Sequence, residues 1–247
     1  MKDKTSVSYP YQTIWFLMLL CLLICSLTFA DGDTRRATQA EKELNITVLQ
    51  SFAKTIPPGP DGWEKTAMTD IKDIQYVPDI KLPLRIEYHI AWQDTKRIQE
   101  ANIKLQEELI KLAQKPGFTG EGVEEMQQKM EPHDVEVRID ISANLTSQGI
   151  YEKVIPAPAI AGGLVYRSQG GNRSGWKEGS TYIFFGKGWK MTSSTSSGTY
   201  IDFKPEKPMT TEAAVRNIVV HIQADPARSQ QIIQKIDWDA LKKLIRN

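Results

Sequence analysis

Two stretches of this chain alternate between apolar and polar residues with a period of two. Between positions 84 and 92 the even-numbered residues are Leu, Ile, Tyr, Ile and Trp, and between 135 and 145 the odd-numbered residues are Val, Val, Ile, Ile, Ala and Leu. Successive side chains of a strand point to opposite faces, so this pattern predicts two half-buried strands. Further apolar runs predict additional strands at 164–166, 181–185, 200–203 and 218–222.

The polar faces of the two clearest strands carry charges of both signs. Arg85 and Glu87 lie on the first, and Glu136, Arg138 and Asp140 lie on the second. If the strands pair antiparallel, we expect Arg85 and Glu87 to sit opposite one of these three residues. This face of the sheet is then wet, and helices cover the other face.

Helical periodicity follows the first strand and returns at the end of the chain. Asp94 is a suitable cap for a helix that runs to Gln114, whose apolar residues recur at three- and four-residue steps. These residues are Ile98, Ala101, Leu105, Leu109 and Leu112. The stripe is about wide enough to cover the helix's own sheet, so we expect self-packing, with a partner surface as the alternative. Asp225 and Pro226 begin a closing helix.

Strands joined by turns and flanked by helices predict an α+β fold with a mostly antiparallel sheet, one face of which is covered by helices. These include the long helix after the first clear strand and the C-terminal helix. One turn, at 186–188, predicts a hairpin into 189–191. We find no repeat or linker, so residues 41–247 are expected to form a single α+β domain, preceded by a polar, mobile lead-in at 31–40.

The first thirty residues have the order of a secretory signal peptide. Lys2 and Lys4 precede a long apolar run, and small residues at 28 and 30 come before an abruptly polar segment. We therefore expect cleavage after Ala30 and export to the periplasm or the cell exterior. The alternatives are an uncleaved anchor over 13–30 and, less favoured, lipid modification at Cys25.

Export would leave a chain without cysteine and without net charge. Cys21 and Cys25 both precede Ala30, so no disulfide is expected in the mature protein. The whole chain has 31 basic and 30 acidic residues, and removal of Lys2, Lys4 and Asp3 leaves 29 of each. Because nucleic-acid and anionic-membrane binders usually carry a basic excess, we expect no nucleic acid as partner, and a membrane only if residues 13–30 are retained.

Patterns for common catalytic and cofactor sites are missing from the sequence. The histidines are His89, His133 and His221, and no pair has the spacing of a helical zinc site, so no metal or cofactor is predicted. Gly-x-Ser-x-Gly and phosphate-loop motifs are also missing. His89 and His221 each lie in a predicted strand and could approach Asp140, which makes the three an alternative acid/base group, although histidines that serve the sheet structurally are favoured.

Aromatic residues beside polar ones provide another candidate site. Trp176 lies in a loop rich in Gly, Ser and Asn next to Arg173, and Trp189 follows the predicted turn. Aromatic faces near hydrogen-bond donors can stack on sugars or short peptides, so these three residues are candidate ligand contacts. Packing of Trp189 in the core is the alternative.

Together these patterns favour an exported cell-envelope protein that acts as a binding or structural module without enzymatic activity. Its partner would be an envelope component or a small ligand. One alternative is an exported hydrolase of envelope glycans or peptides that uses His89, Asp140 or His221. Another is a membrane-tethered adaptor, if the N-terminal segment stays uncleaved.

Overall fold

A computed structural model describes most of the chain after position 33. The described residues are 34–77, 82–115, 120, 122–151, 153–168, 179–186, 188–193, 201–205 and 213–246. Within them the protein is α+β with mostly antiparallel sheets, as the sequence predicts. The expected signal peptide and both cysteines lie outside them. No helix among the described residues is long and apolar enough to span a bilayer.

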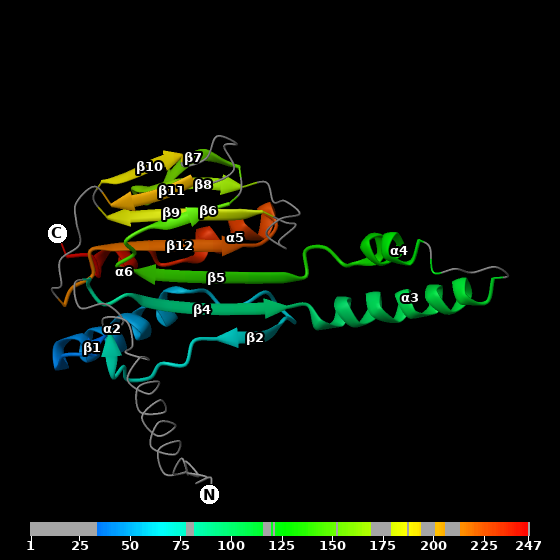
Figure 1. The fold of residues 1–247 in the computed structure, drawn as a ribbon, viewed down its shortest axis with the longest axis horizontal. Coiled ribbons are helices and arrows are strands. Elements are labelled where there is room, and N and C mark those ends of the chain that lie inside the picture. Colours follow the sequence, from blue (N-terminus) through cyan, green and yellow to red (C-terminus); the bar gives the residue numbers. More distant parts are fainter. Residues whose placement is uncertain are drawn as a thin grey trace, which may run out of the picture.

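A seven-stranded antiparallel sheet forms the body of the protein, in the order β2-β4-β5-β12-β9-β8-β7 (Figure 1). Its strands are β2 (Glu64–Met68), β4 (Ile86–Gln93), β5 (Glu136–Ala143), β7 (Val154–Ile160), β8 (Gly163–Ser168), β9 (Ser180–Gly186) and β12 (Asn217–Gln223). The two strands with the clearest alternation, β4 and β5, are neighbours, as expected.

Helices cover one face of this sheet. They are α2 (Gln39–Thr55), α5 (Pro226–Lys235) and α6 (Trp238–Lys243). Phe52 of α2 and Leu241 of α6 belong to the same core as Ile139 and Ile141 of β5, and all four are fully buried. Each such side chain contributes roughly 1.5–3 kcal/mol through removal from water, so this core holds the sheet rigid beneath the opposite face.

The N-terminal end of the described chain is part of the fold. Arg35–Arg36 form the short strand β1, which pairs with β3 (Tyr76–Val77), inside the stretch that the sequence suggests as a lead-in. Thr38 then caps α2 in a capping box with Glu41.

A second, three-stranded sheet covers part of the opposite face. Its order is β10-β11-β6, with β6 (Gln148–Ile150), β10 (Trp189–Ser193) and β11 (Ile201–Pro205). Phe203 of β11 and Ile150 of β6 pack on Phe184 and Val219 of the large sheet. The predicted hairpin at 186–188 is wrong, because β9 pairs with β8 and β12 while β10 pairs with β11.

The long helix α3 (Thr95–Ala113) does not cover the sheet. With α4 (Val123–Met130) it forms an arm that projects from the body (Figure 1). Neither helix contains a buried residue. The expectation that α3 packs on its own sheet is therefore wrong in this detail: its apolar stripe faces α4, since periodicity identifies an apolar face but not what covers it.

Candidate functional site

Three residues that the sequence suggests as an acid/base group lie side by side on the open face. In the antiparallel register His89 of β4 pairs with Asp140 of β5, and Asp140 pairs with His221 of β12. Because paired residues share a face, the three side chains form one row across the sheet. The row continues to Tyr182 of β9, whose ring stacks on the His221 imidazole. The two ring centres are 4.2 Å apart, and the angle between the ring planes is 6°.

The register differs from the expected charge pairing. Glu87 pairs with Ser142, and Gln93 pairs with Glu136, so neither Arg85 nor Glu87 faces an oppositely charged residue across the strands. Arg85 instead forms an ion pair with Glu87 two residues along the chain. The residue opposite Asp140 on β4 is His89.

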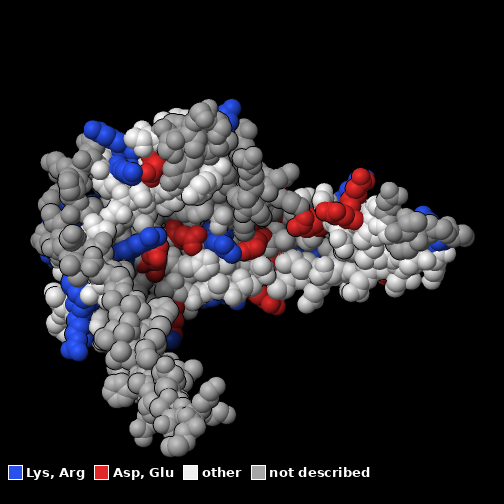
Figure 2. All heavy atoms as spheres, in the orientation of Figure 1, with Lys and Arg blue, Asp and Glu red and all other residues white. Residues whose placement is uncertain are grey.

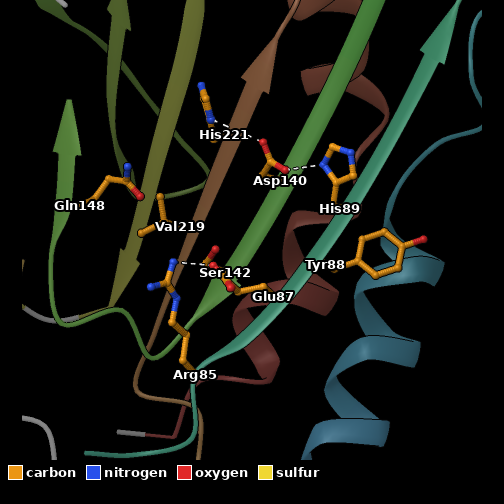
Figure 3. Close-up of a pocket in the computed structure, with 9 residues that line it drawn as sticks. All are labelled: Arg85, Glu87, Tyr88, His89, Asp140, Ser142, Gln148, Val219 and His221. Atoms are coloured by element: carbon orange, nitrogen blue, oxygen red, sulfur yellow. Dashed lines mark hydrogen bonds and ion pairs between the residues drawn. The ribbon is translucent and has the colours of Figure 1, made fainter. Parts of the chain in front are cut away.

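Both imidazoles approach Asp140 through Nδ1. The distance from His89 Nδ1 to Asp140 Oδ1 is 2.5 Å, and the distance from His221 Nδ1 to Asp140 Oδ2 is 3.6 Å, which is an ion-pair distance rather than a direct hydrogen bond. Each oxygen of the Asp140 carboxylate thus faces one imidazole ring (Figure 3). His89 is also anchored through its backbone N–H, which donates to Thr69 Oγ1 at 2.7 Å.

The electrostatics of the row keep Asp140 ionised. Burial raises the pKa of Asp140, but the imidazoles of His221 and His89 lower it by more, so the pKa lies below its ordinary value. An ionised carboxylate only accepts hydrogen bonds, so the Nδ1 atoms that face it carry the protons. In a neutral ring Nε2 is then an acceptor. Nε2 of His221 is buried and has no partner within the described part of the chain.

A pocket of about 310 Å³ lies over this row. It occupies the step where the small sheet ends above the large one, and Gln148 of β6 reaches into it from the small sheet (Figure 3). Arg85, Glu87, Ser142 and Val219 also line it. Charged groups of both signs lie close together along this side of the protein (Figure 2).

The row does not form a metal centre. No group of three His, Cys, Asp or Glu residues in the described ranges is placed to hold a metal ion. Asp140 sits between the two histidines and faces the Nδ1 atom of each, whereas metal ligands must direct bare lone pairs at one shared point. The arrangement can accept, donate and exchange protons.

The aromatic candidates lie elsewhere. Trp176 and Arg173 are outside the described residues. Trp189 packs against Phe184 with ring centres 5.1 Å apart, and its indole N–H donates to the carbonyl oxygen of Phe185 at 3.1 Å. Trp189 does not line the pocket over Asp140, and its role as a ligand contact stays a prediction.

Residues that the sequence did not single out complete the pocket. Ser142 belongs to the same polar alternation as Asp140, so the pattern could have suggested it. Gln148 comes from a strand of three residues in the other sheet, and no local pattern points to it.

Comparison with known proteins found no match of this chain to any family model, curated protein or solved structure.

Proposed function

We propose that this chain is an exported cell-envelope protein, periplasmic or extracellular, that binds a small, uncharged, hydroxyl-rich ligand in the pocket over Asp140. A sugar unit has this chemistry. The observation that carries the proposal is the shared carboxylate: Asp140 is engaged by both histidines, so the pocket offers ligands the Nε2 face of His89 rather than a free acid.

The balance of charge supports an uncharged ligand. Both oxygens of Asp140 face an imidazole, and Arg85 is paired with Glu87, so neither charged group is free to pair with a charged ligand. A phosphate site would need surplus positive charge, and a cation site would need free carboxylates. Hydroxyl groups can donate to an acceptor such as His89 Nε2 and accept from a donor such as Arg85, so a ligand with several hydroxyl groups suits this mixed lining. The volume, about 310 Å³, is at the lower end of the usual range for ligand pockets.

Calorimetric titration of the purified protein with a panel of neutral saccharides and polyols tests this proposal. A compound of this panel that binds should bind the Asp140→Asn variant at least tenfold more weakly, because the asparagine amide no longer fixes the rings of both His89 and His221. Glu136→Gln is the matched control, since it removes the same charge from the same face of β5 outside the pocket. Binding that Asp140→Asn leaves unchanged, or preferential binding of phosphates, would refute it.

Export rests on the sequence of the first thirty residues. The mass of the protein made in its own host should show a chain that starts at Asp31. A chain that retains residues 1–30 in the membrane fraction would instead indicate the tethered adaptor.

A hydrolase is the second candidate, and the short contact between His89 and Asp140 favours it. A carboxylate that holds Nδ1–H orients the imidazole and leaves Nε2 able to take a proton from water. His89→Gln should then abolish cleavage of chromogenic glycosides or peptides, while Glu136→Gln leaves it intact. If no such substrate is cleaved by the unmodified protein, this candidate fails.

A further inference from the structure

The outward face of the arm carries two apolar side chains that nothing in the described structure covers. Ile103 and Ile110 of α3 are 57% and 59% exposed. They are seven residues apart and therefore share one face of the helix. The stripe that includes Leu105 and Leu109 is half-buried on the other side of α3. Ile103 and Ile110 thus take no part in the packing of α3 against α4.

The charges beside these isoleucines form a self-complementary pattern. Glu100, Lys104, Glu107 and Lys111 are exposed and follow one another along the same side of α3, with the exposed Lys96 and Lys115 beyond the two ends of this strip. Within the strip the spacing is four, three and four residues. Read from the C-terminal end, these four charges have the same spacing and the opposite signs. This charged strip therefore complements the same strip of a second copy that runs in the opposite direction.

We propose that α3 pairs antiparallel with α3 of a second copy of this chain. Lys104 then faces Glu107 of the second copy, and Glu100 faces Lys111 of the second copy. The two-fold axis passes between Leu105 and Gln106, so Ile103 faces the position of Glu108 of the second copy and Ile110 faces that of Ala101 of the second copy. A parallel pair would place like charges together, so the strip selects the antiparallel orientation.

The shape of the protein permits this contact. The arm projects beyond the body (Figure 1), and a helix of 19 residues is about 28 Å long, so two antiparallel arms leave the bodies at opposite ends. Lys111 now bonds Glu108 of its own helix at 2.7 Å, an exposed pair that is exchanged at little cost. One helix per copy is a small interface, so the pairing is expected to be weak and concentration-dependent.

Sedimentation velocity of the purified chain over a range of concentrations tests this pairing. Glu107→Lys should raise the dimer dissociation constant about tenfold, because two contacts per dimer become repulsive. The double variant Lys104→Glu/Glu107→Lys should recover the original value within about twofold. Glu125→Lys, the same charge change at an exposed position of α4, is the control.

Removal of the apolar contacts gives an independent readout. Ile103→Gln/Ile110→Gln should weaken the dimer at least tenfold, and circular dichroism should show unchanged helix content because both side chains are exposed. A protein that stays monomeric at every concentration would overturn the proposal. So would a double charge variant that fails to recover, or a dimer indifferent to the isoleucines. Binding of a different protein to this face would replace the second copy as its occupant.

Discussion

Asp140 and His89 face each other across neighbouring antiparallel strands, and their side chains meet at 2.5 Å. The contact lies on the open side of a sheet whose other side is a closed apolar core. The backbone that holds the pair is therefore rigid, while the imidazole itself is about one-third exposed. A fixed carboxylate beneath a reachable ring is the basis of the ligand site proposed above.

Asp140 should make stability depend on pH in the acid range. Its folded pKa is lowered, so its stabilising contribution is complete above the pKa of the unfolded chain and is lost as pH falls through the folded pKa. Urea unfolding of the unmodified protein and of Asp140→Asn should therefore converge as the pH is lowered through that window. A difference that persists at the lowest pH would contradict the ion-pair account.

Glu41 should make a second acid-range contribution to stability. The hydrogen bond from Arg35 lowers the pKa of Glu41 to about 2, against an opposing effect of burial and with help from Thr38. The ion pair therefore stabilises the fold above the unfolded pKa, near 4.5, and is lost as pH falls toward 2. Glu41→Gln should cost roughly 2 kcal/mol at neutral pH after allowance for solvent screening.

Urea unfolding at neutral pH measures this loss. Glu43→Gln, an exposed substitution on the same helix, is the control and should change stability by less than about 0.5 kcal/mol. Equal effects of the two substitutions would show that Arg35 does not stabilise the folded state through Glu41.

Asn144 should be among the least replaceable residues near the site. It follows β5 with a φ of 59°, and its side-chain amide donates to the carbonyl oxygens of Leu84 and Ala214 at 2.9 Å each. Its Oδ1 atom accepts from the backbone N–H of Arg216 at 2.8 Å. Asn144→Ala leaves these buried groups unpaired and strains the backbone, so we expect a loss of about 3–4 kcal/mol.

Thermal and urea unfolding measure this effect, with Asn102→Ala on the exposed face of α3 as the control. Since Asn144 ties the end of β5 to the segments that lead into β4 and β12, the same substitution should also disturb the row of His89, Asp140 and His221. A loss below about 1 kcal/mol would mean that water replaces these bonds without cost.

Much of the sheet could be predicted because burial of one face imposes a period of two on β4 and β5. The register could not, since buried bonds such as those of Asn144 join residues about 60–70 positions apart. The sequence therefore predicted antiparallel pairing correctly but placed Arg85 and Glu87 opposite the wrong residues. It could name His89, Asp140 and His221 only as candidates, because their meeting depends on strand order.

Other features could not be predicted because several structures satisfy the same local pattern. The apolar stripe of α3 is compatible with packing on a sheet or on α4, and only the fold selects α4. The turn at 186–188 is compatible with a hairpin, but β10 belongs to the small sheet, where it pairs with β11. Gln148 enters the pocket from that second sheet, which no short segment reveals.

The most direct test of the ligand site is the protonation of its imidazoles. Nitrogen-15 NMR of histidine-labelled protein at mildly alkaline pH should show both His89 and His221 protonated on Nδ1 and bare on Nε2, with His133 as an internal reference outside the pocket. Addition of a saccharide that binds should then shift Nε2 of His89. A proton on Nε2 of His89 or His221 would contradict the claim that Asp140 holds both rings, and with it the proposed acceptor face of the pocket.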